Sequence, residues 1–165
     1  MRIVLIALFL LLATAVVPAQ DSKFKVGVFA TASEVKGLVP DNFGPEGTTY
    51  RPNVAAEAMA TLGKAGPVRA SAGVTYKYNF TTNVSTYYLN GQASYHWSIF
   101  EPFARFSAGL DRANGSGVFS REVLIGGDLN FKNFYIRPLA VGFKRTGEFL
   151  APAERTYQSG LGFSF

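Results

Sequence analysis

The sequence predicts an all-β protein: an eight-stranded antiparallel up-and-down transmembrane β-barrel. Three observations lead to this fold class. Apolar and polar or small residues alternate over most of the chain, aromatic residues gather at the two ends of the apolar face, and the connections are short at one end. The chain has 165 residues, of which 15% are aromatic and 16% charged, so a disordered chain is excluded. With no cysteine, disulfide scaffolds and thiolate metal sites are excluded as well.

The first segment is predicted to be a signal peptide, residues 1–19, which leaves a single barrel domain at 20–165. Arg2 supplies a positive start, residues 3–17 are almost wholly apolar, and Val17-Pro18-Ala19 provides short side chains for cleavage before Gln20. A membrane-spanning helix is the alternative, but it needs about 20 apolar residues and this stretch is shorter.

Residues 68–80 show the strand pattern most clearly. Every second side chain from Val68 to Phe80 is apolar, and the residues between them are polar or small, which gives a strand two different faces. In chain order, the same alternation predicts strands at 24–33, 54–63, 68–80, 85–98, 103–111, 119–131, 135–145 and 156–165. Clusters rich in Gly, Pro and Asn at 64–67, 81–83, 99–102, 114–117 and 132–133 separate them, as turns require. The two longer connections are 34–50 and roughly 146–155.

The apolar face is predicted to point outward to lipid. An even number of strands in up-and-down order can close into a barrel, and a soluble barrel would instead turn this face inward around a ligand. Aromatic residues on this face form two groups that flank an aliphatic middle, which matches the two girdles of a membrane barrel. The predicted girdle residues are Trp97, Tyr95, Tyr76, Tyr78, Phe80, Phe119, Phe131 and Tyr135.

The C-terminus resembles the terminal β-signal of bacterial outer-membrane proteins. Phe165 is the last residue, and Phe163, Leu161 and Tyr157 occupy the apolar and aromatic positions before it. The whole mature chain resembles the small OmpA/OmpX-like barrels of Gram-negative bacteria. This resemblance implies location in the cell outer membrane and recognition by the barrel-assembly machinery and periplasmic chaperones. Because no residue follows Phe165, the peptidoglycan-binding domain of OmpA itself is not expected.

The inward face is predicted to carry a network of charged residues. Alternation places both acidic and basic side chains there, and buried charges need partners. We expect Glu122 to face Arg105 and Lys144, and Glu57 to approach Lys77 diagonally. The alternative is that these charges lie in water near the rims. A filled and nearly charge-balanced interior argues against a general diffusion pore, while a narrow or intermittent conductance stays open.

No catalytic, cofactor-binding or metal-binding site is predicted. His96 and Ser98, with Glu101 nearby, resemble the His-x-Ser pair of lipid A deacylases, but they are expected to point inward next to a turn, and Ile99 replaces that family's Asn. Acidic residues of the first long connection (Glu34, Asp41 and Glu46) could hold a divalent ion, although a solvated loop is expected. The basic residues are scattered, which excludes the clustered patch that nucleic acid requires.

These observations predict a structural or surface-interaction protein of the envelope rather than an enzyme. Its expected partners are outer-membrane lipids, lipopolysaccharide and the assembly factors, and it is expected to be a monomer. Two alternatives stay open: a lipid A-modifying barrel enzyme, and an adhesin or apolar-ligand-binding barrel.

Overall fold

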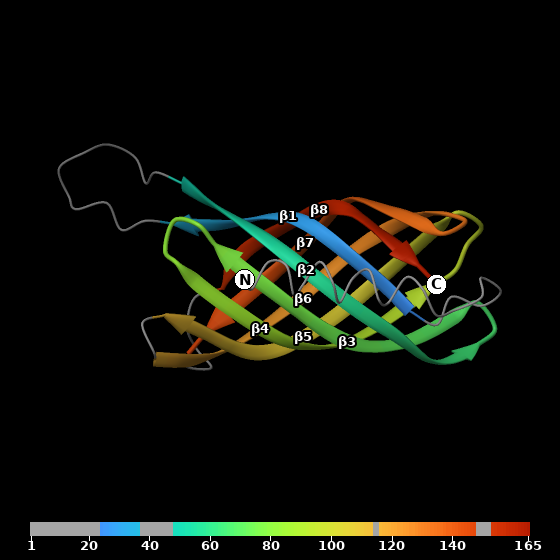
Figure 1. Ribbon diagram of the computed structural model, residues 1–165, viewed down its shortest axis with the longest axis horizontal. Coiled ribbons are helices and arrows are strands. Elements are labelled where there is room, and N and C mark those ends of the chain that lie inside the picture. Colours follow the sequence, from blue (N-terminus) through green and yellow to red (C-terminus); the bar gives the residue numbers. More distant parts are fainter. Residues whose placement is uncertain (1–23, 37–47, 114–115, 148–152) are drawn as a thin grey trace, which may run out of the picture.

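The computed structural model is a closed antiparallel barrel in which each strand pairs with its neighbours in sequence (Figure 1). It describes residues 24–36, 48–113, 116–147 and 153–165; the predicted signal peptide lies outside them. The strands are β1 (Phe24–Lys36), β2 (Thr48–Ala65), β3 (Val68–Asn79), β4 (Val84–Tyr95), β5 (Phe100–Ala113), β6 (Ser116–Phe131), β7 (Phe134–Thr146) and β8 (Glu154–Ser164). Within these ranges, no helix is long and apolar enough to span a membrane.

The pairing of β1 with β8 closes the barrel. Val26 lies opposite Phe163 in this seam, and the pairing continues to Glu34 opposite Arg155. At its end, the backbones of Phe24 and Phe165 exchange hydrogen bonds of 3.2 and 2.9 Å. The eight described strands therefore leave no unpaired sheet edge, which is the structural advantage of a closed barrel.

The two ends of the barrel differ in their connections (Figure 1). At the end that we call the short-turn rim, Gly66-Pro67 joins β2 to β3, residues 96–99 join β4 to β5, and residues 132–133 join β6 to β7. Gly66 has a φ of 59°, a conformation that glycine adopts at little cost. The connections of 37–47 and 147–153 belong to the opposite end, which we call the loop rim. This difference agrees with the sequence prediction.

A β-bulge in β7 changes which residues face inward. The register with β8 shifts between Arg137 and Ala140, so β7 carries one extra residue at Pro138-Leu139. Proline has no N–H to donate to a ladder and is tolerated at such an irregularity. Side chains alternate between the two faces of a sheet with a period of two. One extra residue therefore reverses the inward or outward direction of every side chain beyond it in the strand.

The bulge makes one sequence prediction wrong. Tyr135 was expected in the outward-facing girdle, but its side chain is fully buried inside the barrel. Its neighbours Phe134 and Ile136 face outward instead, while Phe143 on the other side of the bulge keeps the predicted direction. The error came from continuing a strict alternation through Pro138.

The barrel is apolar outside and polar inside. Leu89 and Ile125, near the middle of their strands, are 71% and 62% exposed on the outer face. The buried side chains include many charged and hydroxyl-bearing residues, together with only small apolar clusters such as Phe29 with Tyr135. This distribution is the reverse of a water-soluble barrel and is that of a transmembrane β-barrel.

Candidate functional site

Two parts of the molecule carry functional information: the outer apolar belt and the polar interior. The outer belt is mostly aliphatic in the middle, where Phe106 is an exception, and aromatic residues gather towards both rims. Trp97, which lies beside the short-turn rim, is 70% exposed. Near the loop rim, the rings of Tyr76 and Tyr87 lie 5.2 Å apart and those of Tyr78 and Phe80 meet edge to face at the same distance. Of the predicted girdle residues, all but Tyr135 lie on the outer face.

The centre of the interior is organised around Glu57 of β2. Its carboxylate accepts hydrogen bonds of 2.5 and 3.0 Å from Arg105 and of 3.2 and 3.1 Å from Arg137. Arg105 also donates to the Gln92 side chain at 3.0 and 2.7 Å. All of these side chains are almost completely buried, so the Glu57 carboxylate is shared by two guanidinium groups inside the barrel.

Arg137 binds two carboxylates and lies between two aromatic rings. It donates to both oxygens of Asp128, at 2.8 and 3.2 Å, in addition to Glu57. Its guanidinium lies 4.4 Å from the ring centroids of both Phe29 and Phe103, which adds cation–π attraction. The alternation pattern did not predict Arg137 as an interior residue, because the bulge reverses the direction of its side chain. The one signal that could have found it is Pro138 inside a predicted strand.

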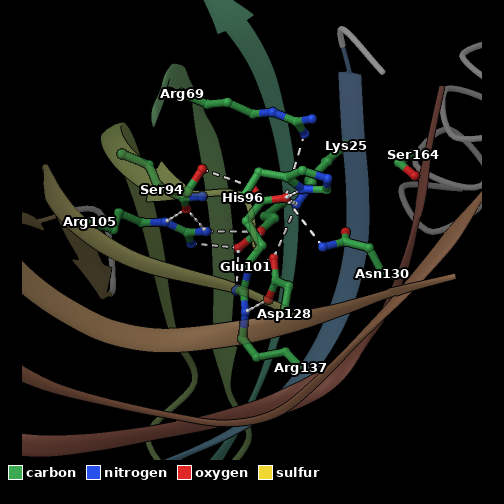
Figure 2. Close-up of polar contacts among 12 residues, drawn as sticks. Lys25, Arg69, Ser94, His96, Glu101, Arg105, Asp128, Asn130, Arg137 and Ser164 are labelled. Atoms are coloured by element: carbon green, nitrogen blue, oxygen red, sulfur yellow. Dashed lines mark hydrogen bonds and ion pairs between the residues drawn. The ribbon is translucent and has the colours of Figure 1, made fainter. Parts of the chain in front are cut away.

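A second cluster surrounds Glu101 towards the short-turn rim (Figure 2). Glu101 forms an ion pair with Lys25 at 3.1 Å and accepts from Ser94 at 2.8 Å and from Asn130 at 3.2 Å. Arg69 approaches the same carboxylate at 3.6 Å. Lys25 also lies 3.4 Å from Asp128, so this cluster is continuous with the central one.

The third cluster lies towards the loop rim. Lys77 of β3 reaches Glu122 of β6 at 2.5 Å, and Glu122 also accepts from Thr156 at 2.7 Å. Lys144 forms an ion pair of 2.7 Å with Asp111. Beyond these pairs, a polar vestibule of about 190 Å³ opens at the rim; its lining includes Arg51, Asn53, Asn79, Asp111, Lys144 and Glu154.

The predicted network residues all point inward, but their pairing differs from the prediction. Glu122 was expected to face Arg105 and Lys144. It does lie directly opposite Lys144 in the β6–β7 register, but its ion-pair partner is Lys77, and Arg105 pairs with Glu57 instead. Glu57 was expected near Lys77, and its partners are Arg105 and Arg137. The prediction used neighbouring strands, while the long side chains reach across the barrel between β2 and β5 or β3 and β6.

The described interior is filled by ion pairs: the central cluster and the Glu101 cluster are joined through Lys25 and Asp128, and the Lys77–Glu122 and Lys144–Asp111 pairs lie towards the loop rim. An eight-stranded barrel is only wide enough for its side chains, and here these side chains are bonded to one another across the axis. Within the part of the chain that the structure describes, a few buried polar atoms have no hydrogen-bond partner: Asn90 Oδ1, the Tyr135 hydroxyl and both amide atoms of Gln158. Such polar groups are sites for buried water.

The residues that resemble a catalytic pair do not form a connected triad. The closest approach between His96 Nδ1 and Glu101 is 3.8 Å, which is longer than a hydrogen bond. Glu101 is held by Lys25, Ser94 and Asn130 instead. Ser98 lies in the β4–β5 turn with a φ of 55°. Among the described residues, no group of His, Cys, Asp and Glu has a metal-binding arrangement, and Asp41 and Glu46 lie outside the described part of the chain.

The four residues of the terminal motif lie along the closing strand. Leu161 and Phe163 are exposed on the outer face, opposite Val28 and Val26 of β1. The Tyr157 hydroxyl donates to Glu34 at 3.1 Å, and the rings of Phe163 and Phe165 stack at 6.5 Å. The motif is therefore displayed on the strand that closes the barrel.

Comparison with solved structures agrees with the fold. No protein-family model and no curated protein matches the chain. The chain is similar to a structure from the de novo design of transmembrane β-barrels, with a TM-score of 0.54, 12% identity, and coverage of 90% of this chain and 100% of that one. A weaker likeness is to Neisserial surface protein A, with a TM-score of 0.48, 17% identity, and coverage of 87% of this chain and 96% of that one. A third and weaker likeness is to OmpT of Vibrio cholerae, with a TM-score of 0.36, 13% identity, and coverage of 88% of this chain and 53% of that one. The chain thus has the fold of a transmembrane β-barrel.

Proposed function

We propose that this chain is an integral protein of the bacterial outer membrane, of the small OmpA/OmpX-like type, with a structural or surface-interaction role in the envelope. One observation carries the proposal. The outer face is a continuous apolar surface with aromatic residues towards both rims, and in water so much exposed apolar area would drive association. Only lipid covers such a surface on every side of a closed barrel.

The interior supports a role that involves neither catalysis nor bulk diffusion. Its charged groups are bonded to one another, and Glu57 and Arg137, which come from β2 and β7, meet in the buried interior where a pore would run. An apolar ligand would find charged and hydroxyl groups instead of an apolar cavity there. What the protein presents to its surroundings is therefore its outer surface and the connections at its loop rim.

The expected biogenesis follows the same proposal. Residues 1–19 would direct secretion, and the motif of Tyr157, Leu161, Phe163 and Phe165 would engage the barrel-assembly machinery after escort by periplasmic chaperones. The short-turn rim would then face the periplasm and the loop rim the exterior. The surrounding outer-membrane lipids, lipopolysaccharide included, are the principal partners of a monomer.

Cell fractionation tests the location. The full-length chain, produced in a Gram-negative bacterium, should be recovered in the outer-membrane fraction, and its unheated form should migrate faster on a denaturing gel than the boiled form. Trp97 is the single tryptophan, so brominated lipids add a test of depth. Bromine near the headgroups should quench its fluorescence more than bromine at the bilayer centre. Recovery as a soluble periplasmic species would overturn the proposal.

Lipid A mass spectra test the absence of catalysis. We expect identical spectra from cells with and without the protein. A loss of acyl chains that disappears in His96→Ala would instead establish a lipid-modifying enzyme and overturn this part of the proposal.

A further inference from the structure

The polar vestibule at the loop rim has two sides that differ in how their polar groups are bonded. Inward-facing residues of β1, β2, β3, β4, β5, β7 and β8 line it. Its volume of about 190 Å³ is below the roughly 300–1,000 Å³ of sites for drug-sized ligands, so it suits a smaller molecule. The polar groups that are left without a partner inside it indicate which molecule that is.

On the side formed by β4, β5 and β7, the polar groups are bonded to one another. Asp111 forms an ion pair of 2.7 Å with Lys144. Its carboxylate also accepts hydrogen bonds from Thr86 at 2.7 Å, Ser120 at 3.0 Å and Thr146 at 3.2 Å. The charges of Asp111 and Lys144 offset each other, so this side needs no further charged partner.

The opposite side, formed by β8, β1 and β2, carries one charge of each sign. Arg51 of β2 and Glu154 of β8 line the vestibule and are partly buried. In the described part of the chain, neither side chain takes part in an ion pair or a hydrogen bond. A charged group that is partly withdrawn from water is stabilised most by a partner of opposite charge. Arg51 and Glu154 therefore call for an anion and a cation respectively.

Two asparagines on the same side add uncharged hydrogen-bonding groups. The Asn53 amide nitrogen donates to the backbone oxygen of Arg51 at 3.1 Å, and Asn53 is only 8% exposed. Its Oδ1 accepts no hydrogen bond from the residues that the structure describes, so a deep acceptor is left over. Asn79 Oδ1 accepts from the backbone N–H groups of Thr81 and Thr82, both at 2.9 Å, which leaves its NH₂ group as a donor.

Strand pairing sets the separation of the two unpaired charges. Arg51 lies opposite Ser33 of β1, and Ser33 lies opposite Thr156 of β8. Glu154 is two residues before Thr156, which places it one inward position nearer the rim. Two strand spacings of about 4.8 Å each separate the backbones of β2 and β8. A small molecule that lies over Ser33 can therefore contact both charges.

We propose that the vestibule binds a small zwitterion that carries a carboxylate and an ammonium group close together, as an α-amino acid does. The carboxylate accepts two parallel hydrogen bonds from the Arg51 guanidinium. The ammonium group donates to the Glu154 carboxylate, and Asn53 Oδ1 is a second acceptor for it. An anion alone would leave Glu154 unpaired, and a cation alone would leave Arg51 unpaired.

This inference adds a ligand class to the proposed surface-interaction role. It rests on that proposed function only for the side of the membrane that the vestibule faces, which is the exterior. The binding itself is a property of the folded barrel and is measured on the purified protein.

Titration calorimetry of the purified full-length barrel with L-glutamine tests the proposal. The barrel is held in nanodiscs of phosphatidylglycerol, a lipid without an ammonium group that could compete. We expect Arg51→Gln and Glu154→Gln each to bind glutamine about tenfold more weakly than the wild type or worse, because a hydrogen bond to a charged group corresponds to at least that factor. The matched controls Arg112→Gln and Glu34→Gln remove the same charges from outward positions at this rim and should bind like the wild type.

Two analogues of glutamine assign the two charges. Glutamine amide lacks the carboxylate, so it should bind the wild type as weakly as glutamine binds Arg51→Gln, with no further loss in that variant. N-acetylglutamine lacks the ammonium group and should show the same relation to Glu154→Gln. Pairing an altered ligand with an altered residue separates a direct contact from a general effect on the fold.

Three results would overturn the inference: no binding of glutamine at millimolar concentration, equal binding of glutamine and both analogues by the wild type, or equal competition by glucose, which would indicate a site for hydroxyl groups instead. The variants are compared only where unheated samples keep the faster migration of the folded barrel. A wild-type protein that lies in the outer membrane and binds no glutamine overturns this inference alone. A wild-type protein found outside the membrane overturns the proposed function.

Discussion

Replacing Glu57 with glutamine tests whether the interior ion pairs hold the barrel together. Glu57 accepts four hydrogen bonds, two each from Arg105 and Arg137. Glutamine keeps one acceptor oxygen, but its NH₂ group would face guanidinium donors, and the negative charge is lost. Two buried cations would then share a site whose nearest carboxylate is Asp128, which is bound to Arg137.

The expected cost is near the lower end of the range for a broken buried ion pair. Removing one partner of such a pair typically costs about 3–5 kcal/mol. Arg137 keeps its two bonds to Asp128 and Arg105 keeps its two bonds to Gln92, so neither guanidinium is left without an acceptor. We therefore expect Glu57→Gln to lower the free energy of unfolding by about 3 kcal/mol.

Urea unfolding in lipid vesicles, followed by the fluorescence of Trp97, measures this change. The matched control is Glu154→Gln, the same chemical change at the loop-rim vestibule, where a partly exposed charge contributes about 1 kcal/mol or less. The double variant Glu57→Gln/Arg105→Gln should recover part of the loss, since it removes one unpaired cation. Equal stability of Glu57→Gln and Glu154→Gln would refute the reasoning, as would a double variant less stable than the sum of the two single changes.

Three other predictions concern the outer face, the strand packing and the terminal motif. Ile125→Arg, near the middle of the lipid-facing belt, should lower the free energy of unfolding in vesicles by about 2–4 kcal/mol, measured with urea. The control Leu62→Arg, beside a short turn, should lower it by about 1 kcal/mol or less. Equal losses in the two variants would contradict a lipid-facing belt. Gly109→Ala should lower the free energy of unfolding by about 1–3 kcal/mol in the same assay, because the added Cβ would clash with the backbone of the neighbouring strand. Gly91→Ala should leave the free energy of unfolding unchanged, because no atom lies within 4 Å of its added Cβ. Phe165→Ala should reduce the amount of folded barrel in the outer membrane of cells, as seen by the mobility of unheated samples, but leave refolding of the purified chain into detergent unchanged; an equal defect in both would assign Phe165 to stability rather than to assembly.

The alternation of side chains was sufficient to predict the strands, because it is a local property of the chain. Residues 68–80, for example, were predicted as a strand, and β3 covers Val68–Asn79. The same pattern predicted that Glu57, Lys77, Arg105, Glu122 and Lys144 point inward. It failed at Tyr135, where the bulge at Pro138-Leu139 shifts the register. A bulge depends on how two strands align, and a single-strand pattern does not contain that alignment.

The partners of the interior charges depend on the closed barrel as well. Glu57 and Arg137 are 80 positions apart in the chain, and Lys77 and Glu122 are 45 apart. Strand neighbours suggested other pairs, because adjacency in a sheet is easier to infer than distance across a barrel. The approach of Arg51 and Glu154 to one vestibule also emerged only from the pairing of β1 with both β2 and β8.

The amino-acid sequence by itself determined the strands, their up-and-down order, the apolar outer face and the short-turn rim, since each of these follows from alternation, turn residues and hydrophobicity along a short stretch of chain. Tertiary structure alone decided which inward charge meets which, that Arg137 and Tyr135 belong to the interior, and that Arg51 and Glu154 line one vestibule. Closure brings residues from distant strands to one axis, and a single extra residue exchanges the two faces of a strand.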